Sequence, residues 1–322
     1  MRRVLLTVAL LGLVAAVTAV FAFPSRATYP GRNGRLMLLT VVCCANTSRE
    51  LITVNADGTG VRGRKVEKFA ADFAVSPDGR RLAYHNGVGI FVSDLNGHHR
   101  RRIARVGDMP TWSPDGRLIA YQAGRGHGNV GLQFYVVSPQ GGRAHRLPGV
   151  VGSQMAWSPD GKKIAFTRGS SRTSQRSELA LVGARGGRAR VLYRPRYAYG
   201  AVGRIDWSPD GRRLVMDVTV ERPDCEGCSP QELPPAPTPS EKKYAGIDVI
   251  RADGSGIRRL SQDGGAPVWS PDGRRVAFVC SNASPSSLGT VGVCVIDQRG
   301  RHRRQIFTTP RELWAPISWL PR

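Results

Sequence analysis

An eight-residue pattern occurs five times along the 322-residue chain. Its copies read VSPDGRRL from Val75, WSPDGRLI from Trp112, WSPDGKKI from Trp157, WSPDGRRL from Trp207 and WSPDGRRV from Trp269. In Ser-Pro-Asp-Gly, the serine can accept a hydrogen bond, the proline fixes φ at the second turn position, and the glycine adopts left-handed geometry. Strand-like residues flank each copy, for example PTW before the turn and RLIAY after it. Each copy therefore predicts a tight β-hairpin.

The residues that recur in every copy of the pattern have structural explanations. Asp and Gly complete the turns, so we interpret a set of ten residues as turn residues: Asp78, Gly79, Asp115, Gly116, Asp160, Gly161, Asp210, Gly211, Asp272 and Gly273. A ring of carboxylates could suggest catalysis, but the turn role already accounts for these aspartates. The aromatic residue before four of the turns predicts core packing rather than ligand stacking: Trp112, Trp157, Trp207 and Trp269.

A second pattern follows each hairpin and completes a four-stranded unit. It consists of an apolar strand, a glycine-containing turn and an arginine-rich strand, as in GIDVIRADGSGIRRL from Gly246. A degenerate sixth hairpin begins at Tyr29, and APISWLPR from Ala315 resembles the strand before each turn. Four-stranded units repeating at roughly 40–45 residues indicate a β-propeller. We predict an all-β fold, one six-bladed propeller of antiparallel blades over residues 28–322, in which the C-terminal strand pairs into the first blade.

The repeat also resembles a known family. WSPDGxxIA, followed by a strand, a turn and RxL, is similar to the TolB-type WD-like propeller repeat of exported bacterial proteins, over most of residues 28–322. The resemblance implies six-bladed propellers that often make protein–protein contacts in the cell envelope. TolB itself carries a further N-terminal α/β domain, for which we expect no room between the N-terminal segment and the first repeat.

The N-terminus has the composition of an export signal. Arg2 and Arg3 precede an uncharged apolar run from Val4 to Phe23. Small residues offer a cleavage point after Ala22 or Ala27, but the run is also long enough to span a bilayer. We therefore interpret residues 1–27 as a signal peptide or as a membrane anchor through residues 4–23. Both interpretations predict an extracytoplasmic protein, in the periplasm or cell envelope or secreted.

The chain is strongly basic. Its formal net charge is +23, and lysine accounts for only six of the 47 cationic side chains. Arginine clusters occur in HHRRRIAR from His98, RGGRARVLYRPR from Arg185 and RGRHRR from Arg299. These clusters could protect exposed edge strands from pairing, or form a basic rim that contacts an anionic glycan or lipid surface. Nucleic acid is not an expected partner, since exported proteins rarely meet it.

The six cysteines suit an oxidising compartment. Cys280 and Cys294 fall in consecutive predicted strands, so we predict a disulfide between them. Cys225 and Cys228 form CEGC in a proline-rich loop, where a small structural bridge is favoured over a metal site or redox chemistry. Two further cysteines, Cys43 and Cys44, could bridge each other or pair with that loop.

These features favour a binding protein over an enzyme. The chain shows no catalytic motif, metal-ligand spacing or cofactor fingerprint. If the strands of each blade are labelled A to D from the axis outward, the variable segments join B to C, and the longest is the proline-rich insertion 221–243. We predict a non-enzymatic protein-interaction module of the cell envelope that binds an envelope protein through its B–C loops. The alternative is a propeller enzyme or carbohydrate-binding protein that acts on an acidic glycan in the axial channel.

Overall fold

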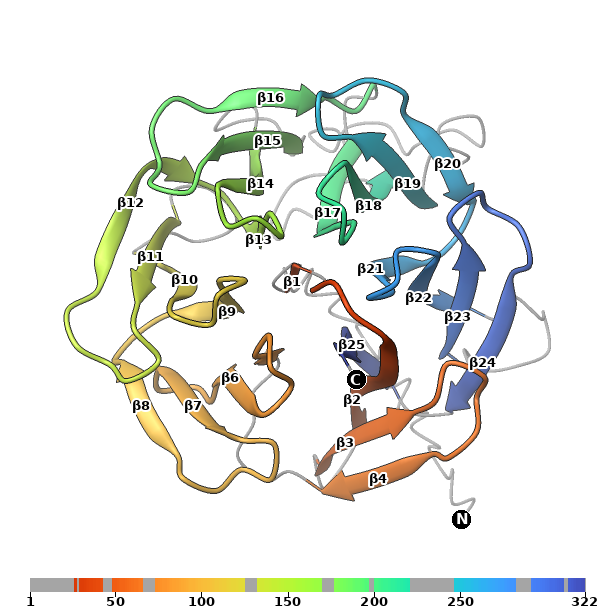
Figure 1. Ribbon diagram of the computed structural model, residues 1–322, viewed down its shortest axis with the longest axis horizontal. Coiled ribbons are helices and arrows are strands. Elements are labelled where there is room, and N and C mark those ends of the chain that lie inside the picture. Colours follow the sequence, from red (N-terminus) through yellow and green to blue (C-terminus); the bar gives the residue numbers. More distant parts are fainter. Residues whose placement is uncertain are drawn as a thin grey trace, which may run out of the picture.

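The computed structural model describes residues 26–27, 29–42, 48–65, 73–124, 132–169, 177–196, 200–220, 246–281, 291–309 and 312–321. These residues form six blades around one axis, each with four antiparallel strands (Figure 1). The predicted all-β six-bladed propeller is confirmed.

The strands run from the axis outward in every blade. Blade 1 holds β25 (Glu312–Pro321), β2 (Asn33–Val42), β3 (Ser48–Val54) and β4 (Arg62–Lys65); blade 2 holds β5 (Phe73–Val75), β6 (Arg81–His85), β7 (Ile90–Asp94) and β8 (Arg101–Ala104). Blade 3 holds β9 (Asp108–Trp112), β10 (Ile119–Ala123), β11 (Gln133–Val137) and β12 (His145–Val151); blade 4 holds β13 (Gln154–Trp157), β14 (Lys163–Gly169), β15 (Ser177–Gly183) and β16 (Arg190–Tyr193). Blade 5 holds β17 (Gly200–Trp207), β18 (Arg213–Val220), β19 (Gly246–Arg251) and β20 (Arg258–Ser261); blade 6 holds β21 (Gly265–Trp269), β22 (Arg275–Ser281), β23 (Val291–Asp297) and β24 (Arg304–Thr309).

The first blade closes the ring. Its innermost strand, β25, pairs antiparallel with β2, which sets Trp319 opposite Leu36. The indole Nε1 of Trp319 also donates to the carbonyl oxygen of Gly34, 3.3 Å away. The predicted closure by the C-terminal strand is therefore confirmed, and one blade combines strands from both ends of the propeller sequence.

The tryptophans of the repeat lie in the core between blades. All four are buried, with at most 3% of each side chain exposed. Trp112 in blade 3 donates from Nε1 to the carbonyl oxygen of Ala74 in blade 2, and Trp207 in blade 5 donates to Ala156 in blade 4, both over 3.1 Å. Each of these hydrogen bonds links an inner strand to the preceding blade, and the indole ring fills the space between the two blades.

The Ser-Pro-Asp-Gly turns satisfy their polar groups locally. In blade 5 the N–H of Gly211 donates to the carbonyl of Ser208 over 2.8 Å. The Ser208 hydroxyl donates to Asp210 (2.5 Å) and accepts the N–H of Arg213 (2.9 Å). Gly211 has φ +67°, a conformation that favours glycine. The other four copies repeat this arrangement, which explains why the same letters recur.

A short strand, β1 (Arg26–Ala27), lies at the centre of the ring (Figure 1). It pairs in parallel with β17, where Arg26 lies opposite Asp206. The hydroxyl of Tyr29 then donates to the carbonyl of Trp112 in blade 3 (3.1 Å), and the N–H of Gly31 donates to Pro271 in blade 6 (3.2 Å). The last two residues of the predicted segment 1–27 thus contact the propeller. None of the described residues forms a helix able to span a membrane.

Candidate functional site

One of the predicted disulfides is present. Cys280 on β22 and Cys294 on β23 are bonded, with their Cα atoms 5.8 Å apart, and both side chains are buried. The bond links the two middle strands of blade 6. The other four cysteines, Cys43, Cys44, Cys225 and Cys228, lie outside the described residues, as do the insertion 221–243 and the apolar run 4–23.

The repeated aspartates do not converge on a common site. Each accepts hydrogen bonds within its own turn; Asp115, for example, accepts from the hydroxyl of Ser113 (2.6 Å) and the N–H of Arg117 (3.1 Å). These serine hydroxyls are the main reason why the pKa values of Asp115 and Asp160 lie below the ordinary value. These ionised carboxylates accept hydrogen bonds within the A–B turns, so they stabilise the turns.

No described group of three or more His, Cys, Asp and Glu side chains could hold a metal ion. One His–carboxylate pair stands out, since His85 Nδ1 lies 2.8 Å from Asp108 Oδ1. Its other ring nitrogen, Nε2, accepts the N–H of Gly87 over 3.1 Å. Both ring nitrogens are therefore engaged, and the pair joins blade 2 to blade 3.

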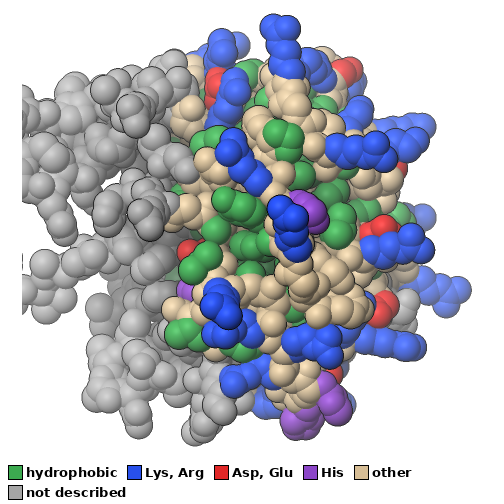
Figure 2. Space-filling model, turned by 90° about the vertical axis from the view of Figure 1, so that its left-hand side faces the viewer, with side chains coloured by type: hydrophobic (Ala, Val, Ile, Leu, Met, Phe, Trp, Pro, Cys, Tyr) green, Lys and Arg blue, Asp and Glu red, His purple; other side chains and the backbone are tan. Residues whose placement is uncertain are grey.

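Basic residues occupy one position of the repeat on one face of the ring. The A–B and C–D turns of all blades lie on this face, which we call the turn face; the A–B turns surround the axis in Figure 1. The residue after each turn glycine is exposed and basic in five blades: Arg80, Arg117, Lys162, Arg212 and Arg274. In the side view of Figure 2, lysine and arginine side chains project at many points, including the right-hand edge. The turn face therefore carries a ring of cations around the axis.

Two hollows on the turn face occupy equivalent positions in consecutive blades. Each has a volume of about 430 Å³ and lies between the A–B turn and the C–D turn of its blade; the blade 6 hollow is also lined by the C–D turn of blade 1. The blade 5 hollow is lined by Asp210, Arg212, Arg213, Val249, Arg251, Gly256 and Arg258. The blade 6 hollow is lined by Ala56, Asp57, Arg274, Arg275, Val295, Ile296, Asp297, His302, Arg304 and Ile306.

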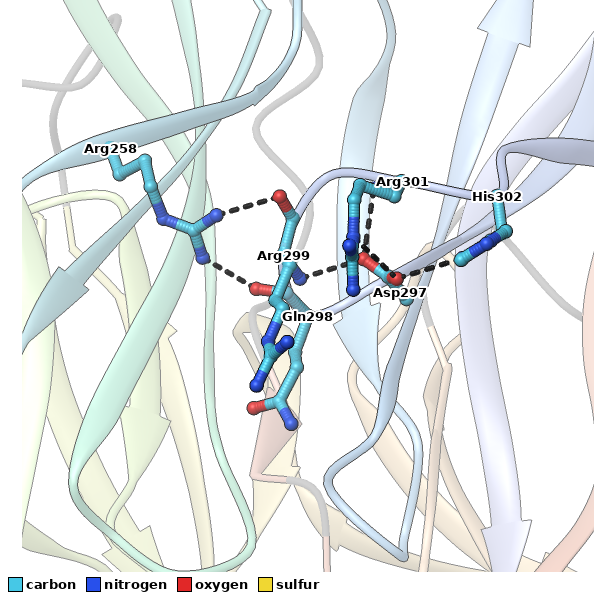
Figure 3. A network of polar contacts seen from close by, with 6 residues as sticks. All are labelled: Arg258, Asp297, Gln298, Arg299, Arg301 and His302. Carbon is cyan, nitrogen blue, oxygen red and sulfur yellow. Dashed lines mark hydrogen bonds and ion pairs between the residues drawn. The ribbon is translucent and has the colours of Figure 1, made fainter.

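Contacts within the protein fix two of the blade 5 arginines. The guanidinium of Arg213 lies over the ring of Trp269, 5.1 Å from its centroid. That of Arg258 crosses to the next blade and donates to the carbonyl oxygens of Gln298 (2.5 Å) and Arg299 (2.8 Å), as Figure 3 shows. Four guanidinium groups thus line this hollow beside a single carboxylate.

The blade 6 hollow is less basic. Asp297 accepts the N–H groups of Arg299 and Arg301 (2.8 Å each), and its Oδ2 lies 3.0 Å from Nδ1 of His302 (Figure 3). Desolvation opposes ionisation of Asp297, but these hydrogen bonds, led by the one from Arg301, lower its pKa to about 2. Asp297 therefore stays ionised at neutral pH and contributes one negative charge to this hollow.

Several arginines of the outer strands connect neighbouring blades, a role that the sequence did not show. Arg64 donates to the carbonyl of Leu95, Arg101 to that of Gln140 and Arg190 to that of Asp253. Like Arg258, each reaches from the outermost strand of one blade to the C–D turn of the next. Part of the arginine excess is thus structural. This role differs from both interpretations of the arginine clusters, protection of edge strands and a basic rim. Only a repeated spacing could have indicated it: Arg101, Arg190 and Arg258 each lie four residues after the first glycine of a C–D turn, although Arg64 does not share this spacing.

Comparison with known proteins supports the fold. No protein-family model matches the sequence, and neither does any curated protein. The structure is similar to TolB from Acinetobacter baumannii, with 18% identity, a TM-score of 0.67 and coverage of 90% of this chain and 67% of that one. A putative TolB from Agrobacterium tumefaciens shares 20% identity at a TM-score of 0.63, covering 86% and 91%. An oligogalacturonate lyase in complex with manganese shares 14% at a TM-score of 0.51, covering 88% and 75%. These similarities support the six-bladed propeller fold, and the similar structures include both TolB proteins and an enzyme.

Proposed function

We propose that the protein is a non-enzymatic binding module of the bacterial cell envelope and that it binds a negatively charged partner through its turn face. The observation that carries this proposal is the repeat position after the turn glycine, which is basic and exposed in five of the six blades. In four of these blades a second basic residue follows, so cations outnumber the aspartates of the same turns and the A–B turns together form a positive surface. Such a surface attracts anionic partners and speeds their association.

The construction of the ring supports a binding role. Indole hydrogen bonds from Trp112 and Trp207 join inner strands, and arginines such as Arg190 and Arg258 join outer strands. A surface on a scaffold held in this way loses little conformational entropy when a partner binds. The disulfide between Cys280 and Cys294 and the similarity to TolB propellers support a location outside the cytoplasm.

Two other locations compete with the turn face. The B–C loops were predicted to bind an envelope protein, and most of them, including 221–243, lie outside the described residues, so this stays a prediction. The axial channel was the predicted site of an acidic-glycan enzyme. It has less support because Ala27, Tyr29 and Gly31 contact blades 5, 3 and 6 around the axis.

Capture from envelope extract tests the proposal. The tagged protein is compared with R80E/R117E/R212E/R274E, which reverses four turn-face charges, and with a variant that lacks residues 221–243. Washes at low salt and at about 0.5 M salt separate screened attraction from salt-resistant contacts. We expect the charge-reversed variant to lose its partners and the loop deletion to keep them. Retention by the first and loss by the second would assign binding to the B–C loops instead.

A further inference from the structure

We propose that the blade 5 and blade 6 hollows are consecutive subsites for a linear anionic polymer, an envelope glycan that carries repeating phosphate or carboxylate groups. This inference rests on the proposed function and names the partner class of the same face. The two hollows are lined by residues at the same repeat positions, since Arg212 corresponds to Arg274, Arg213 to Arg275 and Arg258 to Arg304. Two like sites in adjacent blades suit a ligand whose own charges repeat.

The side chains of the blade 5 hollow suit oxyanions. Arginine presents a planar set of N–H donors that matches the oxygens of a phosphate or carboxylate. Here Arg213 is held against the Trp269 ring, and Arg258 is held by two carbonyl oxygens. Arg212 and Arg251 are exposed at the same hollow. Positive charge is therefore in place before a ligand arrives, while two guanidinium groups remain accessible to bind it.

The same lining is a poor match for an acidic protein. Protein–protein interfaces derive most of their affinity from buried aromatic and apolar anchors and have few charges at their centre. Apart from Gly256, Val249 is the only apolar residue lining the blade 5 hollow. The large apolar side chains that are exposed in the described residues fall in six separate segments: Val61, Val88, Val106, Leu118, Val151 and Ile257. A polymer of many charges needs no such anchor.

The two subsites should differ in strength. The blade 6 hollow contains Asp57 and Asp297 beside Arg274, Arg275 and Arg304, whereas the blade 5 hollow has four arginines and only Asp210. Two carboxylates repel an incoming oxyanion more than one does. Removal of Arg212 should therefore weaken binding more than removal of Arg274, although both residues follow the glycine of an identical turn.

Equilibrium binding at low ionic strength tests the inference. The probes are a polyglycerol phosphate chain, a polygalacturonate chain, inorganic phosphate, neutral dextran, anionic phospholipid vesicles and single-stranded DNA. The variants are R212Q, R274Q and R212Q/R274Q, and the matched control is R80Q/R117Q, which removes two exposed arginines at the same repeat position outside the hollows. All four positions are exposed, so thermal unfolding should be unchanged.

We expect at least one charged polymer to bind far more tightly than phosphate or dextran. The Kd should rise about tenfold in R212Q/R274Q and about twofold in R80Q/R117Q, with R212Q above R274Q. The polymer that binds more tightly identifies phosphate or carboxylate as the recognised group. Equal losses in the two double variants would overturn the subsites and leave the proposed turn-face function standing. Binding that neither double variant weakens would overturn the glycan inference and would also contradict the proposed function. Binding that is confined to anionic phospholipid vesicles or single-stranded DNA would overturn the glycan inference alone.

Discussion

The inner and outer turns of the propeller lie on the same face, yet they are held in different ways. An inner A–B turn satisfies itself: Ser208 and Asp210 bond to backbone and side-chain groups of their own turn. An outer C–D turn also has local bonds, since Asp297 accepts the N–H groups of Arg299 and Arg301. It differs because an arginine of the preceding blade also donates to its carbonyl oxygens, as Arg258 does to Gln298. Local bonds thus define each blade, whereas bonds between the outer turns and strands help to assemble the blades into a ring.

The largest effect is expected at the inner strands. Trp207 is 1% exposed and donates to Ala156 of the neighbouring blade, so W207A should lower the free energy of unfolding by about 3–5 kcal/mol. W207F keeps most of the ring and loses the donor, so its cost should be about 1–2 kcal/mol. Denaturant titrations measure both. A loss of less than about 1 kcal/mol in W207A would show that the junction of blades 4 and 5 does not depend on this side chain.

Two glycines in outer turns differ in how closely they approach the neighbouring blade. Gly186 and Gly97 have φ values of +82° and +81° in equivalent C–D turns. A Cβ at Gly186 would lie 2.4 Å from the carbonyl oxygen of Pro148 in the preceding blade, whereas one at Gly97 would meet nothing within 4 Å. We expect G186A to cost about 2–4 kcal/mol and G97A about 1 kcal/mol, since only the backbone strain is shared. Equal losses of unfolding free energy would mean that backbone strain alone destabilises both variants.

A smaller effect is expected from the arginines that link blades. R258A removes two hydrogen bonds to carbonyl oxygens of blade 6 and should cost about 0.5–1.5 kcal/mol, because the guanidinium is exposed to solvent. R117A, at an exposed A–B turn, is the control and should change the free energy of unfolding by less than about 0.5 kcal/mol. If the two variants are equally stable, the outer arginines contribute charge but no cohesion.

The smallest effect concerns acid. The pKa of Asp297 is about 2 in the folded protein, below its ordinary value of 3.8. The folded state therefore binds the proton less readily than the unfolded chain, and the stability due to this carboxylate is present above about pH 4 and lost as the pH falls towards 2. D297N should flatten this part of the stability–pH curve, measured by thermal unfolding. An unchanged slope would show that Asp297 titrates alike in both states.

The same division explains what the sequence could predict. The hairpins, the blades and the disulfide between Cys280 and Cys294 depend on residues close together in the chain, and closure by β25 is visible because APISWLPR resembles the other inner strands. The contacts of Arg190 and Arg258 were not predictable, since their acceptors are backbone carbonyls of another repeat. The blade 5 hollow was not predictable either, since it forms between two turns that are distant in the chain, around Arg212 and Arg258.

Hydrogen–deuterium exchange on the protein, with and without its bound envelope partner or polymer, would show which face the ligand covers. We expect slower exchange at the turn face, in the turns after Trp207 and Trp269 and in the C–D turns 251–258 and 297–304. Protection confined to the B–C loop segments 43–47, 125–131 and 221–245 would contradict this expectation and assign binding to those loops.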